Sequence, residues 1–368
     1  MPGYQAGGPI RSIFNLVNLL KDDYDITIVT SNRDLNSSTN YVGMNKNISY
    51  SRINGSKVLY LSTFNYIDLI KIILENFDVV HLNSIFSFKF TLVPLMIKKI
   101  SNIKSRYLIS PRGMFHSEAL SKKSNKKKAY LKLTKFLFNQ KNLFFQASNE
   151  YERNQIKLAL KFKPKIFTLE NPVMLPVEKI KSIKIENETI KLLYISRICE
   201  HKNLLLLIIS LKIFCEKTKH KIDLNIYGFI EEKEYWSRCK TEMKNLPFSL
   251  KIAYKGAINS LDKIDIFNKH HFLFLLSKSE NFGHIVYECI SAGRPVFISD
   301  NTPWSALKKI EGGIVTNLNK NNILNSLERI IHLSNADYLR MCKHALKFSK
   351  NFFFKQNYND NFRIFINS

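Results

Sequence analysis

The stretch that decides the fold is residues 279–296, Ser-Glu-Asn-Phe-Gly-His-Ile-Val-Tyr-Glu-Cys-Ile-Ser-Ala-Gly-Arg-Pro-Val. An apolar run at residues 272–276 precedes it and a second lies at 295–299, and both are typical of buried parallel strands. Between them, Gly283 precedes a short segment with helical spacing. The order strand, loop, helix, strand places a helix N-terminus at the carboxyl edge of a parallel sheet. The unpaired N–H groups and positive dipole end of such a helix predict an anion site.

Two glutamates flank this predicted anion site. Glu280 lies on the loop before the helix, and Glu288 lies one turn into the helix, eight positions later. An anion that carries a hydroxyl-bearing group on each side would suit both carboxylates, so the pattern predicts a nucleotide diphosphate sugar as ligand. The alternative interpretation is an ordinary exposed helix with two solvated acids.

The sequence of this region resembles the donor site of retaining GT-B glycosyltransferases of family 4, the glycosyl transferases group 1. The resemblance rests on Glu-x7-Glu with Glu-Asn-Phe-Gly-His, on Ser-Ala-Gly-Arg-Pro-Val, and on Ser-Asp-Asn-Thr-Pro-Trp at residues 299–304. It implies two Rossmann-like parallel-sheet domains that face a cleft, with the nucleotide diphosphate sugar as co-substrate and no other cofactor. A GT-B epimerase or phosphorylase stays open, because a fold does not fix the reaction.

The resemblance also implies roles for individual residues. Glu288 would bind the ribose hydroxyls, and Glu280 would hold the sugar hydroxyls as part of the catalytic set. The donor phosphates would lie at the helix N-terminus. The donor-binding residues of this segment are Asn281, Phe282, Gly283, His284 and Glu288.

Further cations and loop residues follow other predicted strands of the second half. Arg197 and Lys202 come after the strand predicted at residues 191–196, and the resemblance places them in the catalytic set, against the donor diphosphate. The alternative is two surface cations among the chain's 56. Ala257 and Ile258 follow a strand predicted at 250–254, and the resemblance makes them candidates for contact with the nucleotide base, although a simple turn explains them nearly as well.

Candidate residues of the first half also lie at strand and helix ends. Gly8 belongs to a glycine turn that opens a helix and resembles the family's N-terminal glycine loop beside the donor phosphate. Arg112 follows a strand predicted at 107–110, and the resemblance makes it the catalytic candidate on the acceptor side. His116 and His81 are weaker acceptor-side candidates, since a core or surface histidine is the alternative for each.

A possible metal signature was considered and rejected. Residues 23–25, Asp-Tyr-Asp, match the Asp-x-Asp pattern of metal-dependent transferases. They lie at a predicted helix-to-strand turn, where aspartates cap and solvate the backbone. We therefore predict no metal site.

Alternating strand and helix signals run through both halves of the chain and predict an α/β protein with parallel sheets. A proline-marked, polar segment at residues 170–188 separates the halves. The predicted domains are residues 1–175 on the acceptor side, 176–350 for the nucleotide sugar, and a C-terminal helix at 351–368 that packs back on the first domain. Family members usually begin with a central strand before the glycine loop, and this strand is absent here, so two neighbouring strand edges should be exposed.

Composition narrows the class of protein. Hydrophobic residues make up 45% of the 368, enough for packed cores. Five scattered cysteines favour a reducing cytosol over a disulfide framework or zinc site. The sequence shows no signal peptide and no apolar run long enough to cross a bilayer, so a cytoplasmic location is expected.

The net charge of +26 is unevenly spread. Residues 101–140 hold ten Lys or Arg and one acid, and lysines 122, 123 and 126–128 precede an apolar stripe at 130–138. This basic helix fits docking on an anionic membrane, which would make the protein peripheral on the inner membrane face. A solvated lysine face over a buried stripe and, less favoured, nucleic-acid binding are the alternatives.

The sequence thus predicts a metal-independent hexosyl- or N-acetylhexosaminyl-transferase. Its acceptor would be a glycan or a lipid-linked sugar in cell-surface polysaccharide synthesis, such as lipopolysaccharide. The alternatives are an inactive, truncated remnant that binds a nucleotide sugar, and a basic nucleic-acid-binding protein.

Overall fold

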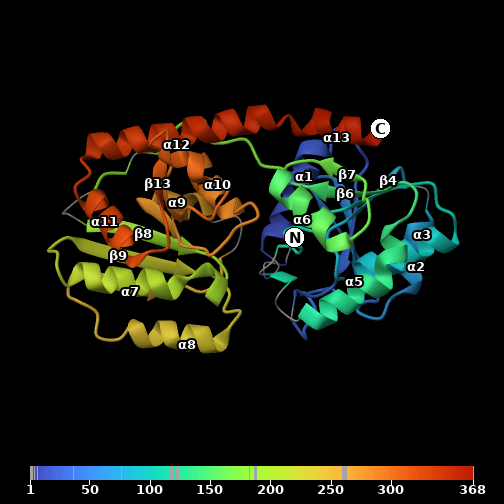
Figure 1. The fold of residues 1–368 in the computed structure, drawn as a ribbon, viewed down its shortest axis with the longest axis horizontal. Helices are drawn as coiled ribbons and strands as arrows, with labels where there is room; N and C mark the ends of the chain where they lie inside the picture. The colour runs from blue at the N-terminus through green and yellow to red at the C-terminus, as the bar shows by residue number, and fades with distance from the viewer. Residues whose placement is uncertain are drawn as a thin grey trace. The chain divides into compact units, whose positions relative to one another are not determined.

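The computed structural model describes the chain except residues 1, 2, 4, 6, 36, 76, 117, 118, 121–123, 182, 186–188, 259–262 and 368. The chain divides into two compact units, Met1–Pro172 with Gln356–Ser368, and Val173–Lys355. Both are α/β units with parallel sheets, as the sequence predicts (Figure 1). They are called the first and second unit below.

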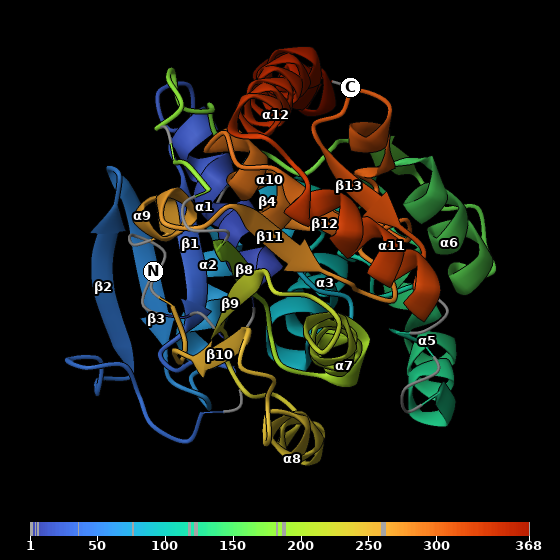
Figure 2. The same ribbon diagram turned by 90° about the vertical axis from the view of Figure 1, so that its left-hand side faces the viewer.

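The second unit is built on a six-stranded parallel sheet in the order β10-β9-β8-β11-β12-β13, whose strands lie side by side in Figure 2. Every residue of its central strands β11 and β12 is buried, which explains why both read as uninterrupted apolar runs. The strands are β8 (Thr189–Ile195), β9 (Lys221–Tyr227), β10 (Leu250–Tyr254), β11 (Phe272–Leu275), β12 (Val296–Ser299) and β13 (Gly313–Thr316).

Helices cover both faces of this sheet, as expected for parallel strands joined by crossovers. α7 (Leu204–Cys215) packs against α8 (Lys233–Glu242) and against α11 (Lys320–Ile331). α9 (Lys263–Asn268) and α10 (His284–Ser291) precede β11 and β12 respectively, and the long helix α12 (Asn335–Gln356) follows α11.

The first unit carries its strands in two sheets. One sheet has the order β1-β3-β2, where β1 (Thr27–Ser31) is parallel to β3 (Ser56–Leu61) and β2 (Ile48–Ile53) is antiparallel to it. The other is parallel throughout, with β4 (Val79–Leu82), β5 (Arg106–Ile109), β6 (Leu143–Ala147) and β7 (Ile166–Thr168) in that order. β1 and β4 are therefore outermost strands of these sheets within the described residues.

One helix joins the two sheets of the first unit. Leu16 and Leu20 of α1 (Gly8–Leu20) share a buried cluster with Leu108 of β5, whereas Val17 of the same helix packs with Ile28 of β1. The C-terminal helix α13 (Tyr358–Asn367) contributes to the first of these clusters through three aromatic residues, Tyr358, Phe362 and Phe365.

A layer of helices covers the face of these two sheets that is opposite to α1. α2 (Ile67–Leu74) packs against α3 (Val93–Ile100), which is preceded by the short π-helix η1 (Phe88–Leu92). α3 in turn packs against α5 (Ser124–Phe138), and α6 (Glu150–Leu160) joins their cluster over β5 and β6. Within the part of the chain that the structure describes, no helix is both long and apolar enough to cross a membrane.

Candidate functional site

The carboxyl edge of the second sheet brings together two segments that are far apart in sequence. β8 and β11 are neighbouring parallel strands, so the loops that follow them meet. Lys202, after β8, reaches Glu280, after β11, with 2.5 Å between Nζ and Oε1. The Ser277 hydroxyl donates to the same carboxylate oxygen over 2.7 Å. The side chains of Lys202 and Glu280 are only 12% and 9% exposed, so this is a buried ion pair.

Lysine determines the charge state of this pair. Burial alone would raise the pKa of Glu280, but the charge and hydrogen bond of Lys202, the Ser277 hydroxyl and the His201 side chain together lower this pKa below its ordinary value. Glu280 is therefore a carboxylate at neutral pH. A buried carboxylate accepts hydrogen bonds only, which suits it to hold hydroxyl groups.

Backbone contacts fix the two loops on each other. The His201 ring bonds to the Ser279 carbonyl over 2.7 Å, and the Lys278 N–H donates to the His201 carbonyl over 2.9 Å. The Glu280 N–H donates to the Asn301 carbonyl over 3.2 Å. The site is thus anchored to rigid elements on both sides, which is what preorganised binding requires.

A second lysine–glutamate pair lies one helix turn further along the site. Lys263, at the start of α9, contacts Glu288 in α10 with 2.8 Å between Nζ and Oε2. Both side chains are largely buried. The sequence analysis missed Lys263, because its partner lies 25 residues away and is brought near only by the sheet order. Its position at the start of a predicted helix before β11 was the only available signal.

The turn into α10 has a backbone that favours glycine. Gly283 has φ 76°, and it directly precedes His284, the first helical residue. The Trp304 indole N–H donates to the Phe282 carbonyl, and the Phe282 and Trp304 rings meet edge to face at 5.1 Å. The Asn281 side-chain oxygen is buried and accepts no hydrogen bond from the described residues. The structure therefore places Asn281, Phe282, Gly283 and His284 together at this N-terminus.

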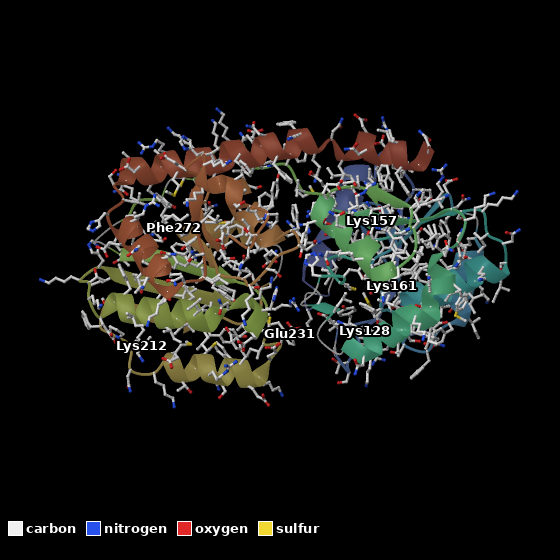
Figure 3. The ribbon with its side chains drawn as sticks, in the orientation of Figure 1. Lys128, Lys157, Lys161, Lys212, Glu231 and Phe272 are labelled. Carbon is white, nitrogen blue, oxygen red and sulfur yellow. The ribbon has the colours of Figure 1, made fainter. Side chains whose placement is uncertain are left out.

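Arg197 is oriented differently from Lys202. Its guanidinium pairs with Glu231, which follows β9, at 2.7 Å, and the side chain is 41% exposed (Figure 3 labels Glu231, and Phe272 at the start of β11). The predicted phosphate-binding cations are therefore on the same loop, but only Lys202 contacts a predicted donor-site residue. An anion would have to compete with Glu231 for Arg197.

A close backbone approach shapes the same edge at β9. A Cβ atom at Gly228 would lie 1.7 Å from the Ser196 carbonyl oxygen, so this position has no room for a side chain. The Gly228 N–H donates to the Gly256 carbonyl after β10 over 2.8 Å. Of the two predicted base contacts that follow, Ala257 is exposed and Ile258 packs partly against the core.

The first unit has its own constellation at strand ends. His81 in β4 bonds to the Ser110 hydroxyl after β5 over 2.5 Å, and Ser110 in turn donates to Gln146 in β6. Burial, with a smaller contribution from the charge of Arg112, lowers the pKa of His81 to about 3. His81 is therefore a neutral, half-buried histidine, which favours the core alternative over an acceptor-side acid or base.

Arg112 is held by neutral groups. It donates to the side-chain oxygens of Asn83, over 2.8 Å, and of Asn171, and its φ is 55°. Burial lowers the pKa of Arg112, while Tyr358 and Glu152 act in the opposite direction. An arginine stays protonated in proteins, so this guanidinium keeps its charge.

Glu152 is a buried residue that the sequence analysis missed. One carboxylate oxygen accepts from the Gly113 N–H over 2.7 Å, and the other accepts from the N–H and hydroxyl of Ser148 at 2.9 and 2.6 Å. It thereby fixes the loop that carries Arg112. Its signal was its place in the first turn of α6, three residues after the N-cap Asn149.

The other two first-unit candidates lie at separate places. The His116 ring meets Tyr151 edge to face at 5.2 Å. Gly8 is the first residue of α1 and is exposed. The structure therefore groups His81 and Arg112 at adjacent strand ends, whereas His116 packs against Tyr151 of α6 and Gly8 opens α1.

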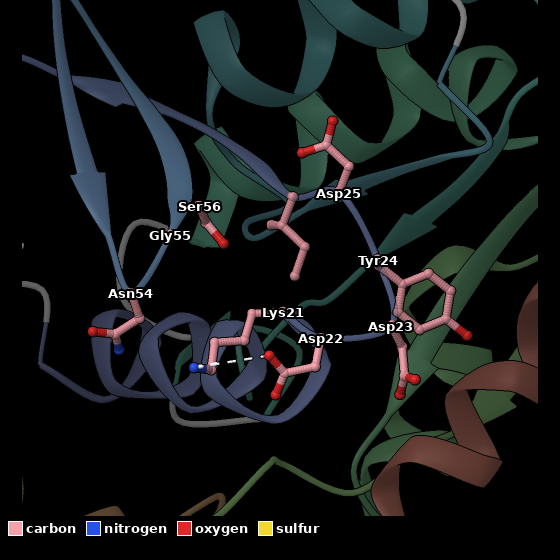
Figure 4. A pocket seen from close by; sticks show the side chains of 9 residues that line it. Lys21, Asp22, Asp23, Tyr24, Asp25, Asn54, Gly55 and Ser56 are labelled. Atoms are coloured by element: carbon pink, nitrogen blue, oxygen red, sulfur yellow. Dashed lines mark ion pairs between the residues drawn. The ribbon is translucent and has the colours of Figure 1, made fainter.

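The pocket of Figure 4, about 490 Å³, lies at the other end of the first unit's strands. It surrounds the start of β1 and includes the rejected Asp-Tyr-Asp motif. There Asp23 pairs with Arg363 at 3.0 Å. No group of three or more His, Cys, Asp or Glu side chains among the described residues could hold a metal ion. The lining residues are Lys21, Asp22, Asp23, Tyr24, Asp25, Ile26, Asn54, Gly55 and Ser56.

Comparison with known families identifies the type of domain that the second unit contains. Residues 177–348 match the family model for glycosyl transferases group 1. This part of the chain is a glycosyl transferases group 1 domain. The domain match spans the Lys202–Glu280 and Lys263–Glu288 pairs and the whole six-stranded sheet from β8 to β13.

Solved structures resemble the chain over nearly its full length, and the group 1 domain is part of that likeness. Sucrose-phosphate synthase from Thermosynechococcus elongatus is 13% identical, with a TM-score of 0.68 over 98% of each chain. Anabaena HepE, solved with UDP and glucose, is 12% identical, with a TM-score of 0.67 over 95% of this chain and 94% of that one. A UDP-forming trehalose-phosphate synthase from Burkholderia xenovorans, solved with glucose-6-phosphate, is 10% identical, with a TM-score of 0.70 over 98% and 96%.

At these identities the likeness establishes the GT-B fold alone. No curated protein sequence matches the chain.

Proposed function

We propose that the protein is a retaining glycosyltransferase that moves a sugar from a nucleotide diphosphate sugar to an acceptor. The observation that carries the proposal is the buried Lys202–Glu280 pair at the carboxyl edge of a parallel sheet, with Lys202 after β8 and Glu280 on the loop before α10. Ligands of open α/β sheets bind at this edge. The domain match to glycosyl transferases group 1 covers both residues.

Sugar transfer requires groups in the site that stabilise developing negative charge. Breaking the bond between sugar and diphosphate leaves charge on the leaving diphosphate. Lys202 and the N–H groups of the α10 N-terminus would be positioned for that charge, and Arg197 would join them after release from Glu231. Electrostatic preorganisation of this kind contributes about 3–4 kcal/mol for a single donor. No metal is required by this scheme.

The carboxylates and Asn281 serve recognition. Glu288, held by Lys263, would bind the ribose hydroxyls. Glu280, as an ionised carboxylate, would accept from sugar hydroxyls, and the buried side-chain oxygen of Asn281 offers an acceptor beside it. Arg112 keeps a full charge among neutral amides and is proposed as the acceptor-side cation. His81 is assigned no chemical role, because its ring stays neutral.

We assign the acceptor and setting from the resemblance to family 4. The acceptor would be a glycan or lipid-linked sugar in cell-surface polysaccharide synthesis, with a hexosyl or N-acetylhexosaminyl donor. The enzyme would work in the cytoplasm, peripherally attached to the inner membrane face. Sugar phosphates are the second class of acceptor, because one neighbour was solved with glucose-6-phosphate and another is a sucrose-phosphate synthase.

The test is nucleoside diphosphate release from UDP-glucose and from UDP-N-acetylglucosamine. Release is measured with glucose-6-phosphate or a bacterial lipid extract as acceptor. Glu288→Ala should lower release on the order of a hundredfold, the scale of losing a positioned polar contact. Circular dichroism should show a folded variant.

The matched control is Glu328→Ala, which removes an exposed glutamate of α11. It should leave release near the parent rate. Near-normal release from Glu288→Ala, or an equal loss in both variants, would contradict the assignment of the donor site.

A further inference from the structure

Three neighbouring helices of the first unit turn apolar stripes toward solvent. These helices, α2, α3 and α5, form one layer and are called the three-helix face. The spacing within each helix is three or four residues or their sum, so every stripe follows one side of its helix. The exposed side chains are Ile67, Ile70 and Leu74 on α2, Met96 and Ile100 on α3, and Leu133 and Phe136 on α5.

The exposure is large and is not a by-product of loose packing. Ile100 is 81% exposed, Leu133 73% and Ile67 70%, whereas Leu95, Phe138 and Leu69 on the other sides of the same helices are buried. A surface helix normally presents charged and polar residues to water. Two further rings are exposed, Phe64 before α2 and Phe88 in η1, and the Phe88 ring meets that of Tyr66, the residue before α2. Exposed apolar side chains gathered on adjacent helices are typical of an interaction site.

Lysines accompany the stripes, and acids are scarce. α3 and α5 contain no Asp or Glu. Lys128, Lys132 and Lys135 are exposed on α5. They are four and three residues apart, so they also follow one side of the helix. The Lys99 ammonium of α3 lies 4.7 Å from the Phe136 ring centre, which joins the two helices. α2 adds exposed Lys71, with Asp68 bound to Asn65 and Glu75 at its end. Lys122 and Lys123 of the predicted basic helix lie outside the described residues.

We propose that the three-helix face docks on an anionic lipid bilayer. The aliphatic stripes would enter the boundary between headgroups and acyl chains, and the lysines would reach the anionic headgroups along their flexible stems. Nucleic acid fits less well, because it offers no apolar layer to cover Ile67, Ile100 and Leu133. The surface deepens the proposed function, since a lipid-linked acceptor lies in that membrane, yet its test needs no turnover.

The experiment is flotation of the full chain with phosphatidylcholine vesicles, with and without phosphatidylglycerol. The protein should float with the anionic vesicles and be released by salt. Lys128→Gln/Lys132→Gln/Lys135→Gln should weaken this binding on the order of a hundredfold, because each lysine near a charged membrane contributes about a factor of five. Lys240→Gln/Lys244→Gln/Lys251→Gln changes the net charge equally in the second unit and should bind like the parent.

A second set of variants, with its own control, tests the contribution of the exposed apolar side chains. Leu133→Ser/Phe136→Ser should reduce flotation at least tenfold, while Phe248→Ser, at a 95% exposed ring in the second unit, should not. Nucleotide-induced thermal shifts should be the same in all variants, which separates this test from that of the donor site.

Three outcomes would overturn the proposal. In the first, the protein does not float with either vesicle. In the second, the two lysine variants lose binding equally, so only net charge matters. In the third, the serine variant floats like the parent while random duplex DNA competes with the vesicles, which would favour nucleic acid as partner.

Discussion

The carboxyl ends of the strands in the two units differ in how their charged side chains are paired. In the second unit, each predicted donor-site carboxylate meets a lysine, Glu280 with Lys202 and Glu288 with Lys263. In the first unit, Arg112 is bound by the amide oxygens of Asn83 and Asn171. The second edge is therefore balanced before a ligand arrives, and an anion must share or displace a carboxylate. The first edge instead presents a cation whose direct partners are neutral.

The largest expected effect comes from Gly228, which lets the loops after β8 and β9 approach each other at the carboxyl edge of the second sheet. Gly228→Ala places a Cβ atom against the Ser196 carbonyl, 1.7 Å away, so the backbone must move. The loss in free energy of unfolding should exceed about 5 kcal/mol, beyond the about 1–3 kcal/mol that is typical of overpacking. Urea denaturation followed by circular dichroism measures it.

Gly256→Ala is the matched control on the next loop. Its φ is 79°, but nothing lies within 4 Å of an added Cβ, so it should cost only about 1–2 kcal/mol. Equal losses in the two variants would mean that the approach of Gly228 to Ser196 is not what limits this position.

Breaking the buried ion pair should have the next largest effect. Lys202→Met leaves Glu280 buried without its cation and should destabilise the protein by about 3–5 kcal/mol. Glu280→Gln in the same chain should restore most of this loss, because the uncompensated charge is then gone. Both are read from urea denaturation at neutral pH.

Arg197→Met gives the comparison within the same loop. The Arg197–Glu231 pair is about 40% exposed, so its loss should cost only about 0–1 kcal/mol. A cost for Arg197→Met as large as that for Lys202→Met would contradict the difference in burial between the two pairs.

The first unit should respond to pH through His81. Its pKa in the folded chain is about 3, below the ordinary 6.5, so between these values the unfolded chain binds the additional proton. Folding stability should therefore fall as the pH drops from 6.5 toward 3, by up to about 1.4 kcal/mol per pH unit for this group. Hydrogen exchange of β4 and β5 amides, measured at several pH values, reports the slope.

His81→Gln should flatten this slope, whereas His332→Gln, at an exposed residue of the second unit, should leave it unchanged. An unchanged slope in His81→Gln would show that another group controls the acid sensitivity of β4 and β5.

Sequence reasoning succeeded where local pattern and structure coincide. The strand from Phe272 and the helix after Gly283 could be predicted, because continuous burial and a positive φ leave clear signals in sequence. It missed β2, whose residues Ile-Ser-Tyr-Ser-Arg-Ile are half exposed and pair antiparallel with β3. A short, half-exposed strand of this kind leaves too weak an apolar pattern to be identified from the sequence.

The partners of the site residues could not be predicted for a different reason. Glu231, Lys263 and Glu152 meet Arg197, Glu288 and the Arg112 loop only through strand order and helix packing. The same holds for the three-helix face. The sequence showed a basic helix with an apolar stripe, but the stripe divides into buried Leu137 and exposed Leu133 only once α5 packs on α3.

The most direct test of the donor site is a thermal-shift panel with UDP, GDP, ADP and dTDP on the parent chain and on Glu288→Ala. A ligand at a hundred times its Kd adds about 2.7 kcal/mol, which raises Tm by several degrees. The account predicts that one nucleoside diphosphate raises Tm and that Glu288→Ala loses most of this shift. A shift with none of the four, or a shift that Glu288→Ala retains in full, would contradict the placement of the donor at the carboxyl edge of the second sheet.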